Sequence, residues 1–151
     1  MNILTINLGS SSLRFALYKK TKLLAKGHID AIGLPSCKFI FKSSDKNIGH
    51  KSDCKTPASA LTLLYTTLTK NGFTAPDAVA HRVVHGGDKY TQAVKIDKKV
   101  IKEIEKLCSL APLHNPINLK GIKFFQEKYP KAKQVAVFDT AYYQTLEPKA
   151  Y

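Results

Sequence analysis

The sequence predicts an α/β domain built on one mixed sheet, in which an antiparallel β-meander is followed by parallel strands and packing helices. Two observations support this fold class. The chain opens with three strand-like segments joined by short turns. After residue 55, helical and strand-like segments follow in the order α–β–α–α–β, which is typical of helices packed on a partly parallel sheet.

The opening meander is expected at residues 2–8, 13–19 and 22–29. The first of these segments alternates, and it is partly β-branched. Residues 30–55 are polar and irregular, and we interpret them as an insertion. Within the insertion only residues 38–43 have a strand-like pattern, which predicts one added edge strand.

A helix is expected to begin after Thr56 and to end near Asn71. Thr56 is a favourable N-cap residue, and Pro57 suits the first helical position. The next segment, residues 77–84, is dense in apolar side chains and predicts a buried strand. A loop at residues 85–90 follows it.

Two more helices and a last strand complete the predicted fold. The second helix is capped by Asp97, and its apolar stripe consists of Val100, Ile101, Ile104, Leu107 and Cys108. Asn115 and Pro116 are interpreted as the cap and first-turn pair of a third helix, which runs to about residue 129. Residues 133–139 predict a final strand that ends in the carboxylate of Asp139.

Length and composition are typical of one globular domain. The chain has 151 residues, of which 44% are hydrophobic and 23% charged. No apolar run approaches the roughly 18–20 residues of a membrane helix, and residues 7–12, which include Asn7 and three serines, interrupt any signal-peptide core. Three cysteines without a CxxC spacing disfavour a disulfide scaffold and a zinc site. We therefore expect a cytoplasmic protein with no membrane partner.

The net charge of +13 raises the question of a nucleic-acid partner. Only two of the 24 basic residues are arginine, Arg14 and Arg82, and the lysines are scattered singly. Nucleic-acid readers use arginine for bidentate contacts and aromatic residues for stacking. The pattern therefore predicts a solvated basic surface and no nucleic-acid partner. Both arginines, by contrast, lie in polar, glycine-bearing segments.

Polar residues lie where the predicted strands end. Asn7 precedes a glycine–serine turn, and Arg82 precedes a His-Gly-Gly loop. Asp139 ends the last strand, and the loop with His114 could join them. Ligands bind off the carboxyl ends of parallel strands. A glycine–serine cradle, an arginine, a histidine and a carboxylate suit phosphoryl transfer, although the sequence has no Walker A pattern.

Each of these features also has a purely structural alternative. The serine-rich turn can be a hairpin loop, Asp139 a turn residue, and His114 a partner of a helix end. The His-Gly-Gly segment can be a turn that needs a positive φ. His81 lies inside a predicted strand and is expected to be a packed, hydrogen-bonded core histidine. The joint placement at strand ends favours the functional interpretation.

Four segments occur in order along the chain: NLGSSSLRF, AHRVVHGGDKYT, APLHNPINLKGI and QVAVFDTAYYQT. Together they resemble the N-terminal half of the acetate kinase family, which belongs to the superfamily of sugar kinases, actin and heat-shock chaperone ATPases. The resemblance covers almost the whole chain and is weakest at residues 30–55. It implies a ribonuclease-H-like, actin-like N-terminal domain over residues 1–151, with the C-terminal kinase domain absent.

The resemblance implies reversible phosphoryl transfer from ATP to acetate, giving acetyl phosphate and ADP, with Mg²⁺ as cofactor. The catalytic residues that it implies are Asp139, Arg82 and His114. The implied substrate-binding residues are Arg82, which holds the carboxylate, and Val84 and Leu113, which surround the methyl group. The implied ATP- and phosphate-binding residues are Ser10, Ser12 and Arg14, and the implied metal residue is Asn7.

The chain departs from the family in two motif positions and in length. The family usually has lysine at the position of Arg14 and histidine at that of Tyr143. The resemblance places the adenosine pocket and further phosphoryl-binding groups in the missing half. Because this catalysis depends on positioning and electrostatics, the isolated chain is expected to be inactive.

Two other functions stay open at this point. One is a propionate or butyrate kinase, and the other is a non-catalytic remnant that binds acyl or phosphate ligands. The resemblance implies acetate or acetyl phosphate and ATP or ADP as ligands, and a homodimer of the full-length form. A separate polypeptide that carries the C-terminal half is a further candidate partner.

Overall fold

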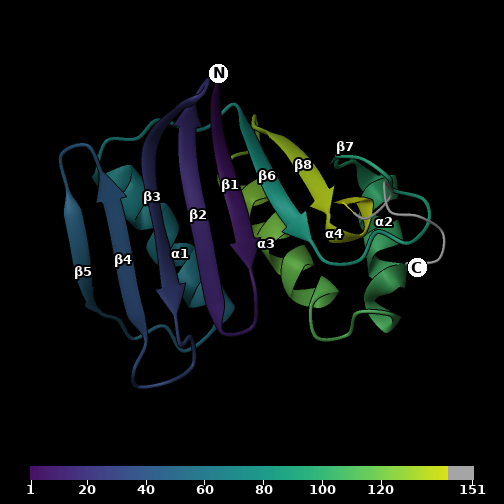
Figure 1. Ribbon diagram of the computed structural model, residues 1–151, viewed down its shortest axis with the longest axis horizontal. Helices are drawn as coiled ribbons and strands as arrows, with labels where there is room; N and C mark the ends of the chain where they lie inside the picture. The colour runs from purple at the N-terminus through teal and green to yellow at the C-terminus, as the bar shows by residue number, and fades with distance from the viewer. Residues whose placement is uncertain (143–151) are drawn as a thin grey trace.

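The computed structural model describes residues 1–142, which form an eight-stranded sheet with helices packed on one of its faces (Figure 1). The strands are β1 (Asn2–Leu8), β2 (Ser12–Lys19), β3 (Lys22–Asp30), β4 (Lys38–Ser43), β5 (Asn47–Lys51), β6 (Ala78–Val83), β7 (Val94–Lys95) and β8 (Lys133–Phe138). Their order across the sheet is β5-β4-β3-β2-β1-β6-β8-β7. The predicted mixed sheet, with a meander followed by parallel strands, is confirmed.

Strands β1 to β5 form an antiparallel meander in which each strand pairs with the next. Residues 38–43 do form a strand, but the prediction that this strand is the edge is wrong. Strand β5 pairs along the outer side of β4 and is itself the edge. Its sequence NIGHK is almost entirely exposed, so it has no alternation of buried residues that could have predicted it.

Strands β1, β6 and β8 run parallel to one another, so their carboxyl ends meet at one edge of the sheet. The pairing of β1 with β6 ends at Ile6 and His81, whereas the pairing of β6 with β8 continues to Val83 and Phe138. Strand β7 lies antiparallel to β8. It has only two residues, which is too short for any sequence pattern to predict.

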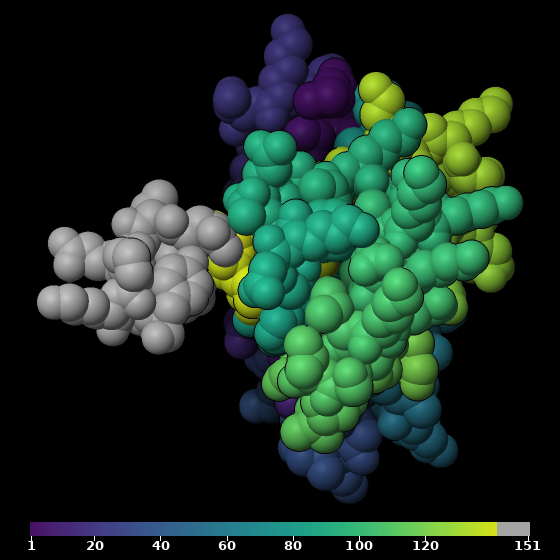
Figure 2. All heavy atoms as spheres, turned by 90° about the vertical axis from the view of Figure 1, so that its right-hand side faces the viewer, coloured from purple at the N-terminus to yellow at the C-terminus, as the bar shows by residue number. Residues whose placement is uncertain are grey.

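The helices are α1 (Pro57–Lys70), α2 (Lys98–Lys106), α3 (Asn115–Lys128) and the single turn α4 (Asp139–Tyr142). Helices α1 and α3 lie behind the strands in Figure 1. The view in Figure 2 faces α2, and the lysines of this helix are exposed. None of the helices in residues 1–142 is long and apolar enough to cross a membrane.

The predicted N-caps of the first two helices are confirmed. The hydroxyl of Thr56 accepts a hydrogen bond from the backbone N–H of Ser59 at 3.2 Å, within a capping box. The carboxylate of Asp97 accepts from the N–H of Val100 at 2.8 Å. The second helix is shorter than predicted, because Leu107 and its two successors form the 3₁₀ turn η1 (Leu107–Ser109).

The prediction that Asn115 caps the third helix is wrong. His114 occupies the N-cap position, and its side chain makes no capping hydrogen bond. Asn115 is the first residue of α3 and is fully buried. Its amide is satisfied by a different segment of the chain, described below.

Two clusters of buried side chains form the core between the sheet and the helices. The first joins β1 to β4 with α1, and the second joins β6 and β8 with α2 and α3. Within the first, the rings of Phe15 and Phe41 stack with centroids 6.3 Å apart. Gly27 on β3 pairs with Phe15 on one neighbouring strand and with Phe41 on the other. A side chain at Gly27 would collide with Phe15 and with the Ile40 carbonyl.

Candidate functional site

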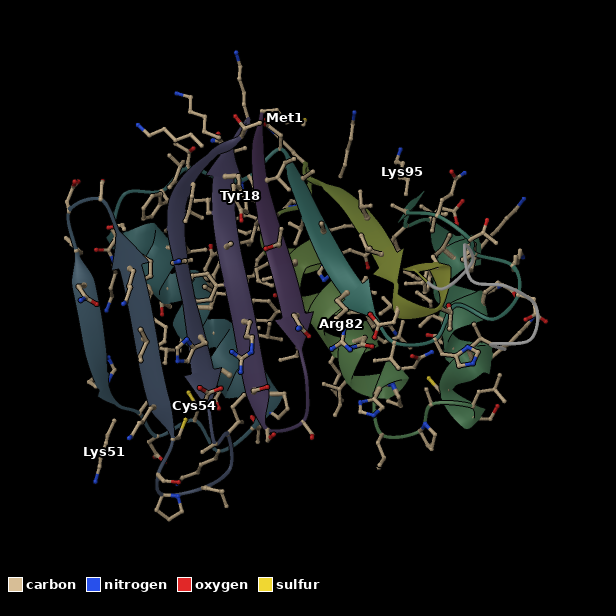
Figure 3. All side chains as sticks on the ribbon, in the orientation of Figure 1. Met1, Tyr18, Lys51, Cys54, Arg82 and Lys95 are labelled. Carbon is tan, nitrogen blue, oxygen red and sulfur yellow. The ribbon has the colours of Figure 1, made fainter. Side chains whose placement is uncertain are left out.

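Three polar side chains meet at the carboxyl ends of the adjacent strands β1, β6 and β8. Figure 3 labels Arg82, one of the three, at the end of β6. Asn7 and Arg82 are the penultimate residues of their strands, and Asp139 follows β8 as the first residue of α4. Because Leu8 and Val83 next to them are buried against the helices, Asn7 and Arg82 project from the open face of the sheet. The structure therefore brings together three of the residues that the sequence places at strand ends.

Arg82 is the centre of this cluster. Its Nε–H donates to Oδ1 of Asp139 at 2.8 Å and its Nη2 donates to Oδ2 at 2.6 Å, so the guanidinium holds the carboxylate through two parallel hydrogen bonds. Its Nη1 donates to Oδ1 of Asn7 at 3.1 Å. The hydrogen bond to Asp139 raises the pKa of Arg82 above its usual value, and partial burial opposes that shift.

The Arg82–Asp139 pair is better suited to binding than to stabilising the fold. The two side chains keep 49% and 32% of their surface exposed, and exposed ion pairs contribute only about 0–1 kcal/mol. A guanidinium has five N–H donors. Within residues 1–142, Asp139 and Asn7 engage three of them, which leaves one N–H on each terminal nitrogen for a further carboxylate or phosphate oxygen.

The serine-rich turn directly follows Asn7 and connects β1 to β2. The N–H of Gly9 donates to the carbonyl of Ser12 at 2.8 Å, which closes the hairpin. Ser10 is exposed and Ser12 is half-buried, so their hydroxyls are accessible to a ligand. Arg14 lies opposite Asn7 in the β1–β2 register, and its Nη2 is 3.7 Å from Oδ1 of Asp30. Arg14 thus lies on the same face of the sheet as Asn7, and the turn lies at the end of the same hairpin.

A shallow hollow of about 350 Å³ lies on the open face of the sheet, beside this cluster. The polar residues of its lining are Thr5, Asn7, Arg14, His81 and Arg82, and the apolar ones include Ala80 and Val137. It spans β1, β2, β6 and the end of β8. The hollow therefore offers two cations and one amide beside a small apolar surface.

The loop after β6 is held by side chains from two other elements. The backbone N–H of Val84 donates to Oδ1 of Asn118, and the N–H of His85 donates to Oδ1 of Asn115, both at 3.1 Å. The N–H of Gly86 donates to Oγ1 of Thr140, also at 3.1 Å. The backbone that follows Arg82 is therefore anchored to α3 and α4.

Three further predicted residues lie around this loop without joining the cluster. Val84 is half-buried, whereas Leu113 is 74% exposed and His114 is exposed at the start of α3. Within residues 1–142 no hydrogen bond links the side chains of His114, Ser10 or Ser12 to Arg82 or its partners. Tyr143, one of the two departures from the family motifs, lies outside the described residues.

Sequence reasoning missed Asn118 entirely and misread Asn115. Both are buried on the face of α3 that also carries Leu119 and Ile122. A pair of asparagines at i, i+3 on an otherwise apolar helix face was the available signal, because a buried amide needs hydrogen-bond partners. Those partners lie on β1 and after β6. They are too far from α3 in the sequence for a local pattern to predict the hydrogen bonds.

His81 is a core residue, as predicted. It is 2% exposed, and its Nε2 lies 2.8 Å from Oε1 of Gln134. Desolvation by burial lowers the pKa of His81 to about 4, although the hydrogen bond with Gln134 opposes the shift. The imidazole is therefore neutral near pH 7, and it faces away from the cluster.

The sequence matches known proteins along its whole length. The profile described as the Acetokinase family matches residues 2–151. The proteins named acetate kinase from Helicobacter acinonychis and Helicobacter pylori are each 44% identical over 161 residues, and the alignment covers 100% of this chain and 40% of each relative. The chain therefore spans about two fifths of the length of these curated relatives.

Two solved structures resemble the fold closely. A propionate kinase from Francisella tularensis superposes with a TM-score of 0.87 at 36% identity, covering 98% of this chain and 39% of that one. The Porphyromonas gingivalis acetate kinase superposes with a TM-score of 0.84 at 35% identity, with the same coverage. These likenesses confirm the predicted actin-like fold.

Proposed function

The chain belongs to the acetokinase family, and from this membership we propose that it is the N-terminal part of an acetate kinase. Such an enzyme transfers a phosphoryl group reversibly from ATP to acetate and yields acetyl phosphate and ADP. We propose that residues 1–151 form its N-terminal domain, with residues 30–55 as an insertion. The remaining three fifths of the relatives' length would supply the adenosine pocket.

The observation that best supports this reaction is the environment of Arg82. Its guanidinium already holds one carboxylate bidentately and keeps one N–H on each terminal nitrogen for a further acceptor within residues 1–142. We infer that these donors bind the carboxylate of acetate and then the charge that develops on the transferring phosphoryl group. Asp139 would hold the guanidinium in the required orientation.

The serine turn and its neighbours suit the phosphates of ATP. The accessible hydroxyls of Ser10 and Ser12 can donate to phosphate oxygens, and Arg14 supplies positive charge on the same face. We propose this segment as the phosphate-binding loop. His114, exposed beside the loop after β6, is proposed to donate to the transferring phosphoryl group.

The residues of the cluster also fit Mg²⁺. The ion prefers carboxylate and amide oxygens and completes its shell with water and phosphate oxygens, and Asn7 and Asp139 both present oxygens around Arg82. We propose that these two residues hold Mg²⁺ on the ATP phosphates. When bound, the ion supplies positive charge that neutralises the phosphates.

Propionate is a second candidate substrate, because one of the two similar structures is named a propionate kinase. Two residues are the proposed neighbours of the methyl group. Val84 is half-buried, and Leu113 is 74% exposed. Within residues 1–142, this exposure leaves space beside both residues for a longer acyl chain. We propose acetate as the main substrate and expect the full-length form to be a homodimer.

The test is to restore the missing part. We would fuse residues 1–151 to the C-terminal portion of the Helicobacter pylori acetate kinase, and also mix the two parts as separate polypeptides. Acyl phosphate formation would be measured with acetate, propionate and butyrate. We expect activity of the fusion with acetate, none from the chain alone, and loss of activity in the fusion with Arg82→Ala.

A fusion that unfolds cooperatively but makes no acyl phosphate from any of the three acids would contradict the proposal. It would leave the non-catalytic binder as the better interpretation. Calorimetry of the chain alone adds an independent check. We expect weaker than micromolar affinity for MgATP, because the adenosine pocket would lie in the other part.

A further inference from the structure

The two buried asparagines of α3 connect the segments that carry the candidate site. Asn115 is 0% exposed and Asn118 is 5% exposed. A buried amide is unfavourable unless its donor and acceptor are both satisfied. Both amides are satisfied here, and their partners are backbone groups of other elements. We call this pair the amide bridge.

Asn118 joins β1 to the loop after β6 at the point where the two strands separate. The parallel pairing of these strands ends at Ile6 and His81. Beyond it, Nδ2 of Asn118 donates to the carbonyl of Leu8 at 2.9 Å, and Oδ1 accepts from the N–H of Val84 at 3.1 Å. The side chain therefore takes the place of missing ladder hydrogen bonds and sets the width of the gap.

Asn115 fixes the next residue of the same loop. Its Oδ1 accepts from the N–H of His85 and its Nδ2 donates to the carbonyl of His85, both at 3.1 Å. Gly121 allows α3 to approach β1 closely, because a Cβ atom there would lie 3.3 Å from a methyl carbon of Leu8. The first half of α3 is thus held against both strand ends.

We propose that Asn115 and Asn118 are positioning residues of the phosphoryl-transfer site, an inference that rests on the function proposed above. Leu8 directly follows Asn7 and precedes the serine turn, whereas Val84 lies two residues after Arg82. The amide bridge sets the distance between these two segments. A displacement of about 1 Å in such a site can lower the rate about 10²-fold.

Gln134 offers a matched control for a merely structural role. It is also 5% exposed, and its amide is also satisfied inside the fold, by His81 and the carbonyls of Phe125 and Ala132. It lies near the amino end of β8, away from the cluster. Gln134→Leu and Asn118→Leu each remove one buried amide. The first loses a contact with the His81 ring on the helix side of β6, whereas the second loses the backbone groups of Leu8 and Val84 that flank the site.

The first measurement uses the 151-residue chain and does not depend on activity. The Arg82 Nε–H signal in ¹⁵N NMR reports its hydrogen bond to Asp139, and hydrogen exchange reports the N–H of Val84. We expect Asn118→Leu to shift the Arg82 signal and to accelerate Val84 exchange at least tenfold, while Gln134→Leu changes neither. An Arg82 signal that is the same in both variants overturns the proposal.

The second measurement uses the fusion described above. We expect Asn118→Leu and Asn115→Leu to lower kcat about 10²-fold with an acetate KM within about threefold of the parent. Gln134→Leu should leave kcat unchanged, although it should lower the melting temperature by about as much as the asparagine variants do. If the asparagine variants and the Gln134→Leu variant have the same kcat and the same melting temperature, the proposal is overturned. Should Asn118→Leu fail to fold, the smaller change Asn118→Ser is measured in the same two ways.

The two proposals fail separately. A parent fusion without activity contradicts the kinase function, whereas the Arg82 signal in the chain alone still decides whether the amide bridge positions Arg82. An active parent fusion with an unaffected Asn118→Leu variant keeps the kinase function and overturns the positioning role.

Discussion

The antiparallel and parallel parts of the sheet share one alternation of buried residues but place their polar residues differently. In both parts alternate residues pack against helices, for example Phe41 on β4 and Phe138 on β8. In the meander, successive strands run in opposite directions, so the carboxyl ends of two neighbouring strands lie at opposite sides of the sheet. In β1, β6 and β8 all three carboxyl ends lie at one edge.

The charged and titratable groups also meet at different distances in the two parts. In the meander, Asp30 lies 3.7 Å from Arg14 and 3.3 Å from His28, on the open sheet face. In the parallel part, Asp139 is held bidentately by Arg82 with a shortest distance of 2.6 Å. Parallel strand direction therefore brings Asn7, Arg82 and Asp139 together. The β1–β2 hairpin of the meander adds Arg14 and the serine turn beside them.

The largest effect is expected from emptying the core of the meander. Phe41 is fully buried and contacts the rings of Phe15 and Phe73. Phe41→Ala should lower the free energy of unfolding by about 3–5 kcal/mol, measured by urea denaturation. Ile40→Ala, on the half-buried opposite side of the same strand, is the matched control and should cost clearly less. The Arg82 Nε–H signal of the folded fraction should be unchanged, and a shifted signal would mean that the two parts are coupled.

Arg82→Lys should have the opposite profile, with a large kinetic effect and a small effect on stability. Lysine offers a point charge in place of a planar fork, so in the fusion kcat should fall about 10²–10³-fold and the acetate KM should rise. The melting temperature should change little, because the ion pair is half exposed. Normal kinetics beside a lowered melting temperature would show that Arg82 is structural.

His81 should make the parallel part sensitive to acid. Its pKa is lowered to about 4 in the folded state, from an unfolded value near 6.5. Between these values the unfolded chain binds a proton that the folded chain does not, so stability falls as the pH falls from 6.5 to 4, by about 3 kcal/mol in total. His81→Gln should flatten this dependence in urea unfolding at several pH values. An unchanged slope would contradict the lowered pKa.

The smallest effect is expected at the start of α1, which packs on the meander. Thr56→Ala removes the capping hydroxyl and should cost about 1 kcal/mol of unfolding free energy. Thr62→Ala, in the exposed middle of the same helix, is the control and should lie within about 0.5 kcal/mol of the parent. Equal effects of the two changes would mean that the cap does not stabilise the helix.

The amino-acid sequence alone is enough to predict the local features of this protein. Strand alternation, the caps at Thr56 and Asp97, and the buried strand with His81 all depend on neighbours within a few residues, so their patterns are visible in one dimension. The family motifs are similarly contiguous, and they indicated the acetokinase family and the actin-like fold.

Contacts between residues far apart in the sequence depend on the tertiary fold. Arg82 and Asp139 are 57 residues apart, and Asn118 bonds the carbonyl of Leu8 across 110 residues. The sequence assigned Asn115 to a local cap, because that is what an Asn-Pro pair does in isolation. In the fold, the parallel strands β1 and β6 separate and leave backbone groups that need partners. Burial makes an unsatisfied amide costly, so those distant backbone groups, and not the helix end, set the role of Asn115 and Asn118.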